Sequence, residues 1–130
     1  MEQVKAFNPQ DIERLEANEA CPRCDLSGAN LSGNNLSGVN LRDANLKGAD
    51  LTSTNLSNAD LTGADLQNAV MSNANLSGAS LVGANLRSAL MENANLFYAA
   101  LMSANLSAAN LTGASLFLAN FRGANFRLTT

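Results

Sequence analysis

The chain has 130 residues, a net charge of −3, 46% hydrophobic residues and only 5% aromatic residues. This length suits one domain, and the scarcity of aromatic side chains means that Leu and Ala must supply most of the buried volume. The sequence contains no His, so nucleophilic catalysis lacks its most common base. It also has no basic stripe that could follow a nucleic-acid backbone and no apolar run of membrane-spanning length. We therefore expect no nucleic-acid binding and no membrane insertion.

The first predicted element is a short helix at about residues 9–19, within an N-terminal cap at residues 1–23. Asn8 is placed to be the helix N-cap and is followed by a Pro at the first helical position. Ile12 and Leu15 share one helix face. We expect that face to cover the open end of the core that follows.

A Cys-x-x-Cys pair, Cys21 and Cys24, follows this helix. Both residues fall in the inward register of the repeats described below, which favours a local disulfide, or two buried thiols, that fastens the helix to the first coil. The alternative is a redox-active pair of the thioredoxin type. In such enzymes the first cysteine begins a helix, whereas here the pair comes after one. Two cysteines without a His or a second pair are a poor zinc site, so no metal and no cofactor is expected.

Residues 24–128 repeat with a period of five. An apolar residue, Leu in most units, recurs at every fifth position from Leu26 to Phe126, which gives 21 units. Ala lies two positions earlier in 17 of the 21 units, and Asn or Asp usually lies between the two. Residues two apart in an extended segment point to the same side. The Ala and Leu positions should therefore face inward and the Asn or Asp outward, with Ser-Gly or Thr-Gly pairs at the turns.

Departures from the repeat indicate how many units make one coil. The inward exceptions Asn34 and Thr54 are 20 residues apart, as are Met71 and Met91. Eight large apolar residues at outward positions also pair at a spacing of 20: Val70 with Leu90, Val82 with Met102, Phe97 with Phe117, and Tyr98 with Leu118. Twenty residues per coil means four sides, and the repeats then form about five coils.

The Ala-Asn-Leu-Ser-Gly unit at residues 29–33 resembles the pentapeptide-repeat family, and the resemblance covers residues 24–128. It implies an all-β solenoid, a right-handed quadrilateral β-helix of about five coils with a short N-terminal α-helical cap. The Cys-Pro-Arg-Cys-Asp-Leu segment at residues 21–26 is similar to cyanobacterial and chloroplast members, whose repeats follow a helix and a Cys-x-x-Cys. That similarity implies the periplasm or the thylakoid lumen, after removal of a signal peptide, ahead of the cytoplasm.

We expect the protein to be a non-catalytic scaffold, not an enzyme, that offers one flat face to a protein partner or to a second copy as a homodimer. The predicted contact surface is the set of outward apolar residues, since such patches usually mark interfaces: Phe97, Tyr98, Phe117, Leu118, Val82, Met102, Val70 and Leu90. An alternative that the resemblance implies is a DNA mimic that binds topoisomerase. Mimicry needs a dense acidic surface, but the repeats hold six acidic residues against five basic ones. A second alternative, a thiol-disulfide redox protein, depends on Cys21 and Cys24 alone.

Overall fold

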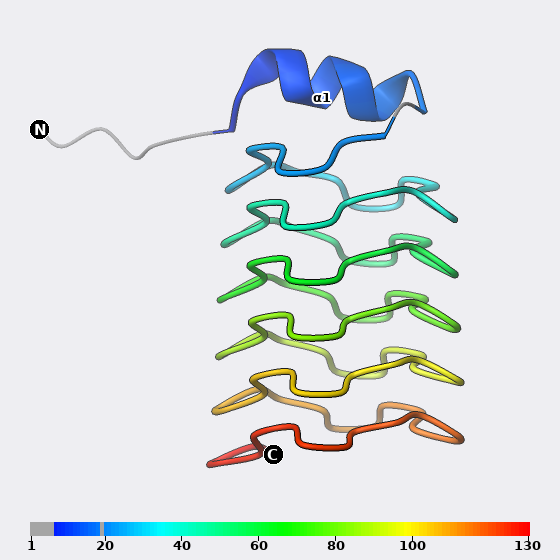
Figure 1. Ribbon diagram of the computed structural model, residues 1–130, viewed down its shortest axis with the longest axis vertical. Coiled ribbons are helices and arrows are strands. Elements are labelled where there is room, and N and C mark those ends of the chain that lie inside the picture. The colour runs from blue at the N-terminus through cyan, green and yellow to red at the C-terminus, as the bar shows by residue number, and fades with distance from the viewer. Residues whose placement is uncertain (1–6, 19) are drawn as a thin grey trace, which may run out of the picture.

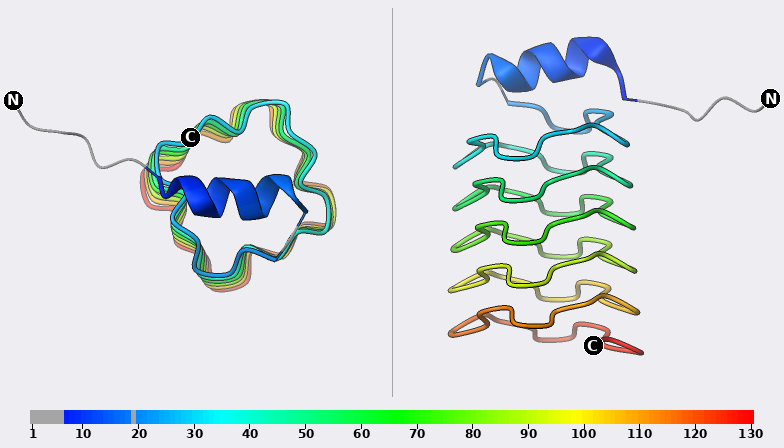
Figure 2. Two further views of the ribbon diagram at one scale, coloured as in Figure 1. Left: turned by 90° about the horizontal axis from the view of Figure 1, so that it is seen from above. Right: turned by 180° about the vertical axis from the view of Figure 1, so that it is seen from behind.

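The computed structural model describes residues 7–18 and 20–130, which form one helix above a stack of similar coils (Figure 1). Seen along the stack, the coils follow one four-cornered outline and lie almost directly over one another (Figure 2). Parallel bridges join residues 20 apart, from Asp25–Asn45 at one end to Asn105–Asn125 at the other. One coil therefore takes four five-residue units, which confirms the predicted coil period.

Backbone hydrogen bonds connect each coil to the coils on both sides. The N–H of Leu46 donates to the carbonyl of Asp65 in the next coil at 2.8 Å, and the N–H of Asn45 donates to Cys24 in the previous coil at 2.8 Å. Each corner is closed by a turn bond, such as Ala49 N–H to the Leu46 carbonyl at 3.0 Å. In the described part of the chain the bridges are isolated, with no longer strand, because each side is straight for too few residues.

The Leu and Ala positions fill the interior, as the repeat predicts. In mid-stack, Leu66 and Ala64 are 0% exposed, and Met71 and Met91 occupy Leu positions with the same complete burial. Thr54 is also fully buried, and its hydroxyl donates to the Leu31 carbonyl at 2.8 Å, which satisfies the one polar group of its side chain.

The outward Asn or Asp that most units contain has a structural role that periodicity alone does not reveal. Its side-chain oxygen accepts a hydrogen bond from the backbone N–H two residues later, as Asp65 does from Gln67 at 3.1 Å. This bond forms an Asx turn, which directs the chain into the corner. The same bond recurs at residues 25, 30, 35, 40, 45, 50, 55, 60, 75, 85, 95, 105, 110, 120 and 125.

Two of these Asx-turn carboxylates have lowered pKa values. Hydrogen bonds from the side chain and backbone of Thr52 lower the pKa of Asp50. For Asp60, burial raises the pKa, but hydrogen bonds from Thr62 and from Arg42, whose Nη1 lies 3.0 Å from Oδ2, together bring the pKa below its usual value. Both carboxylates are therefore more stable as anions in the folded protein than in the unfolded chain.

We expect a small acid-dependent loss of stability from these two groups. Because their folded-state pKa values are depressed, their contribution is fully present above the unfolded-state value of about 3.9 and is lost as the pH falls through the folded-state values. The Asp50→Asn/Asp60→Asn variant keeps the Asx-turn acceptors and removes the titration. Urea unfolding at about pH 3 and about pH 6 should show a smaller difference for this variant than for the parent. If the free energy of unfolding changes equally with pH in the variant and the parent, Asp50 and Asp60 are not the source of the acid-dependent loss.

Helix α1 (Pro9–Glu16) lies across the first coil (Figure 1). The side chain of Asn8 accepts a hydrogen bond from the Gln10 N–H at 3.0 Å, as expected of an N-cap. Leu15 is 1% exposed and Ile12 packs partly buried against the same core, so the predicted face covers this end. No helix in the described residues is long and apolar enough to cross a membrane.

Two sequence-based expectations about this end need correction. The helix ends at Glu16 and does not continue to about residue 19, because Asn18 adopts a left-handed conformation (φ 61°) that terminates it; residues 1–6 and 19 lie outside the described residues. Asn34, expected inside, is exposed. It lines a shallow hollow beside the end of α1 with Leu15, Glu16, Asn18, Asn35 and Leu36, where the helix leaves the first coil uncovered.

The core becomes more accessible in the last coil. Leu116 is 41% exposed and Phe126 is 45% exposed, although both occupy inward positions. The rings of Phe121 and Phe126 lie against each other, 5.2 Å apart, and Phe121 also packs against the core. The two Phe residues therefore cover this end only in part.

Candidate interaction surface

Phe97, Tyr98, Phe117 and Leu118 form an exposed aromatic corner, the name used below for these four residues. They lie at the same turn in two successive coils, and the rings of Phe97 and Phe117 stack 5.9 Å apart with an interplanar angle of 16°. Tyr98 meets Phe97 edge-on at 4.7 Å. Phe117 is 67% exposed and Tyr98 is 60% exposed, so solvent reaches most of this surface. The structure thus brings together the four residues that the 20-residue spacing placed side by side.

The backbone makes this corner unusual among the turns of the rod. The last turn residue of each unit has positive φ, which Gly63 (70°) and Asn68 (58°) adopt readily. Tyr98 and Leu118 hold the same conformation at 59° and 61°. For a bulky side chain this conformation costs about 1–2 kcal/mol, and neither exposed side chain recovers that cost by burial in the core. Strained, exposed apolar residues of this kind are typical of functional surfaces.

The other four predicted contact residues lie on the two neighbouring sides of the coil. Val70 and Leu90 are bridge partners in adjacent coils on one side, where Leu90 is 42% exposed and Val70 is partly buried. Val82 and Met102 are turn residues on the other side, and both are partly buried. Their part in binding stays a prediction, and the aromatic corner is the most exposed portion of the predicted surface.

The predicted contact surface leaves out one outward apolar residue, Leu128, at the end of the repeats. It is 80% exposed, holds φ 61°, and lines a shallow hollow with residues that include Arg87 and Arg127. Its position in the five-residue unit is that of Leu118, but it lies two units further on, at another corner of the coil.

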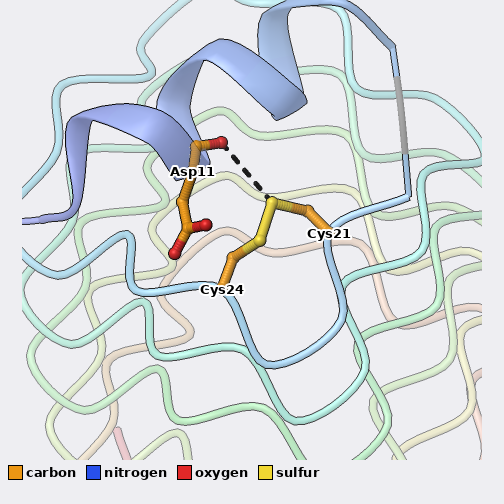
Figure 3. Close-up of side chains that lie close together, drawn as sticks. All are labelled: Asp11, Cys21 and Cys24. Atoms are coloured by element: carbon orange, nitrogen blue, oxygen red, sulfur yellow. Dashed lines mark hydrogen bonds between the residues drawn. A yellow bond between two sulfur atoms is a disulfide. The ribbon is translucent and has the colours of Figure 1, made fainter.

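The Cys21–Cys24 disulfide predicted from the sequence is present beneath α1 (Figure 3). Cys21 is 0% exposed and Cys24 is 2% exposed. The Cys21 Sγ lies 3.5 Å from the Asp11 carbonyl oxygen; a disulfide sulfur carries no hydrogen, so this is a packing contact in the oxidised form. Asp11 Oδ2 accepts the N–H of Asp25 at 2.8 Å and so attaches the helix to the first coil. A redox enzyme needs an accessible thiolate, and this buried pair does not offer one.

The acidic side chains are distributed over different sides of the rod. Asp50, Asp60 and Asp65 bridge to Val70, Ser80 and Asn85, which belong to three separate columns. Asp60 is also paired with Arg42 at 3.0 Å. This arrangement does not supply the dense acidic face that DNA mimicry requires.

Comparison with known proteins places these features in a family. The family model for pentapeptide repeats matches residues 24–63, 54–93 and 94–130. The crystal structure of HetL, a pentapeptide repeat protein involved in heterocyst differentiation regulation in the cyanobacterium Nostoc sp. strain PCC 7120, has 31% identity and a TM-score of 0.73 over 86% of this chain and 61% of HetL. No curated protein sequence matches the chain.

Two further solved structures are similar. A pentapeptide repeat protein of the Arabidopsis thaliana thylakoid lumen has 32% identity and a TM-score of 0.57 over 75% of this chain and 61% of its own. Rfr23 from the cyanobacterium Cyanothece 51142 has 32% identity and a TM-score of 0.57 over 94% of this chain and 95% of its own. The chain thus spans about three fifths of the first two of these relatives and nearly the whole of the third. On the repeats, the coil period and the family match together, the chain belongs to the pentapeptide-repeat family.

Proposed function

We propose that this protein is a non-catalytic scaffold that binds a protein partner through the aromatic corner. The observation that carries the proposal is that Tyr98 and Leu118 stand exposed in a left-handed backbone conformation, where most other units have Gly, Asn or Ser. The rod supplies rigidity, since each coil is fixed by hydrogen bonds to both neighbours. A rigid surface loses little conformational entropy on binding.

The corner has the chemistry of an interface anchor. Two stacked Phe rings offer a flat apolar surface, and the Tyr98 hydroxyl adds a hydrogen-bonding group at its edge. Aromatic residues with this combination dominate binding energy in protein interfaces. The occupant that suits the corner is a protein surface with an apolar pocket or groove, on another protein or on a second copy of this chain.

We further propose that the protein works in an oxidising compartment, the periplasm or the thylakoid lumen. The Cys21–Cys24 disulfide supports this location, since disulfides persist in such compartments. The similarity to a protein of the Arabidopsis thylakoid lumen points the same way.

The decisive variant is Phe97→Ser/Tyr98→Asn/Phe117→Ser/Leu118→Gly, which restores residues that the repeat commonly uses. We expect it to lose binding to the partner, or to fall in mass if the partner is a second copy. The Tyr98→Asn and Leu118→Gly changes each relieve a strained backbone position, worth about 1–2 kcal/mol, so the melting temperature should hold or rise. Light scattering and pull-down with the purified protein as bait measure the two outcomes.

Leu128→Asn is the matched control, because Leu128 is an exposed apolar residue with the same positive φ at another corner, outside the predicted contact surface, and Asn occupies this position in other units. We expect this control to bind and to self-associate as the parent does. If the fourfold variant keeps the same mass and the same bound proteins as the parent while remaining folded, the proposal fails.

A further inference from the structure

Two arginines lie two coils apart at the corner of the rod opposite the aromatic corner. Arg87 and Arg127 occupy the same turn position, and Ser107 holds that position in the coil between them. The N–H of Ser88 donates to the Ser107 carbonyl at 3.0 Å, and the N–H of Ala108 donates to the Arg127 carbonyl at 2.9 Å, so the three turns are stacked. With coils about 4.8 Å apart, the two arginine backbones are roughly 10 Å apart. The small side chains of Ser107 and Ala108 leave a hollow between them.

Neither arginine has a counter-ion among the described residues. The ion pairs in this part of the chain belong to Arg14 and Arg42, so the guanidinium groups of Arg87 and Arg127 are unpaired there. The described side chains that line the hollow include no acidic residue. An anion in the hollow would therefore be attracted by both arginines and repelled by no neighbouring carboxylate.

The hollow also contains uncharged donors that the coil does not use. The hydroxyl of Ser77 donates to Asn75 Oδ1 at 2.7 Å, but Ser107, at the same position in its unit, makes no side-chain hydrogen bond to the described residues. Asn105 and Asn125 accept backbone N–H groups through Oδ1 at 3.0 Å and 2.9 Å, which leaves their Nδ2–H groups as donors. Two guanidinium groups, one hydroxyl and two amides are a donor set that suits an oxyanion.

We propose that the hollow between Arg87 and Arg127, called the arginine site below, binds the phosphate group of a small phosphate monoester. Guanidinium groups pair with phosphate through two parallel N–H···O bonds. A spacing of roughly 10 Å between the two backbones lets one phosphate accept hydrogen bonds from both side chains. The Ser107 hydroxyl lies between the arginines and serves a further phosphate oxygen. Because this site is at the opposite corner, it is independent of the partner proposed for the aromatic corner.

Leu128 indicates that the phosphate carries an organic group. The hollow has a volume of about 370 Å³, which equals about twelve waters at about 30 Å³ each and is more than one phosphate fills. Leu128 lines it, is 80% exposed, and holds φ 61° at a position where most units have Gly or Asn. An apolar side chain beside two arginines suits a ligand whose charged group contacts the arginines and whose carbon skeleton covers Leu128.

The test is a titration of the full chain with phenyl phosphate, followed by NMR shifts of the backbone amides at about pH 7.5, where the phosphate is mainly a dianion. We expect saturable shifts at Ser107 and Ala108. Arg87→Gln and Arg127→Gln should each weaken binding roughly 10-fold, because each removes charge-assisted hydrogen bonds to the same anion. Arg122→Gln is the matched control, since it removes an exposed arginine from the same unit position at another corner, and it should leave the affinity unchanged.

Two further ligands test the two halves of the proposed ligand. Inorganic phosphate lacks the organic group, and benzoate carries a carboxylate in place of the phosphate, so both should bind more weakly than phenyl phosphate. Leu128→Asn should weaken the binding of phenyl phosphate and leave that of inorganic phosphate unchanged.

Four results would overturn the proposal. One is the absence of saturable shifts at Ser107 and Ala108. Another is equal weakening by Arg87→Gln and Arg122→Gln, which would indicate general attraction to a positive charge. Benzoate binding as tight as that of phenyl phosphate would reject the phosphate class. Inorganic phosphate binding as tight as that of phenyl phosphate would reject the monoester, because the ligand would then be free phosphate.

Discussion

Leu66→Ala is expected to lower the free energy of unfolding by about 2–5 kcal/mol. Leu66 is 0% exposed near the middle of the rod, and Leu46 and Leu86 occupy the same place in the adjacent coils. Those coils are held at a fixed spacing by backbone hydrogen bonds, so the rod cannot close around the missing atoms. A cavity therefore remains, and its cost adds to the lost burial of the side chain.

Urea unfolding of the Leu66→Ala and Asp65→Asn variants compares the loss of stability at an inward position with that at the adjacent outward position. Asp65 points outward, and Asn in its place can still accept the Gln67 N–H, so that substitution should change stability by less than about 0.5 kcal/mol. Comparable losses in the two variants would show that the inward and outward positions are wrongly assigned.

Ala64→Leu is expected to be the second most damaging substitution, by about 1–3 kcal/mol or more. Ala64 is 0% exposed, and Ala44 and Ala84 hold the same position in the adjacent coils. The column therefore has room for one methyl group in each coil, and a larger side chain must push the coils out of register. Overpacking of this kind forces strained rotamers or backbone shifts.

Lys47→Leu is the control for Ala64→Leu, since it introduces the same side chain at an exposed turn residue. Its effect should stay within about 0.5 kcal/mol. Thermal melts of the two variants decide the matter. If Ala64→Leu has the same melting temperature as Lys47→Leu and the parent, the interior is wider at the Ala column than the structure indicates.

The sequence was sufficient to predict the rod because each residue type has one role in a five-residue unit. Pairs such as Met71 and Met91 predicted the 20-residue coil from their spacing, and both residues are fully buried. The inward register of Cys21 and Cys24 favoured a local disulfide or two buried thiols, and the structure has the disulfide. Handedness follows from the family resemblance and not from spacing, because a five-residue period is compatible with either hand.

The points that the sequence did not predict depend on contacts between distant segments. Asn34 is exposed because of where the helix stops, and the helix stops at Glu16 because Asn18 adopts a left-handed conformation. Asp11 joins the cysteines only through the docking of α1 on the first coil. The strain at Tyr98 appears only when the turn conformation is known. Periodicity identifies the stack, but not how its ends are covered.

Site-specific photo-crosslinking tests the proposed docking surface most directly. A photoreactive benzoyl-phenylalanine replaces Phe117 in one protein and Lys47 in another; both are exposed turn residues of the same unit position, on different corners of the rod. We predict that illumination of each protein with its bound partner, or at concentrations where it self-associates, gives a specific crosslink from position 117 and none from position 47. Equal crosslinking from both positions, or a crosslink from position 47 alone, would contradict a partner docked on the aromatic corner.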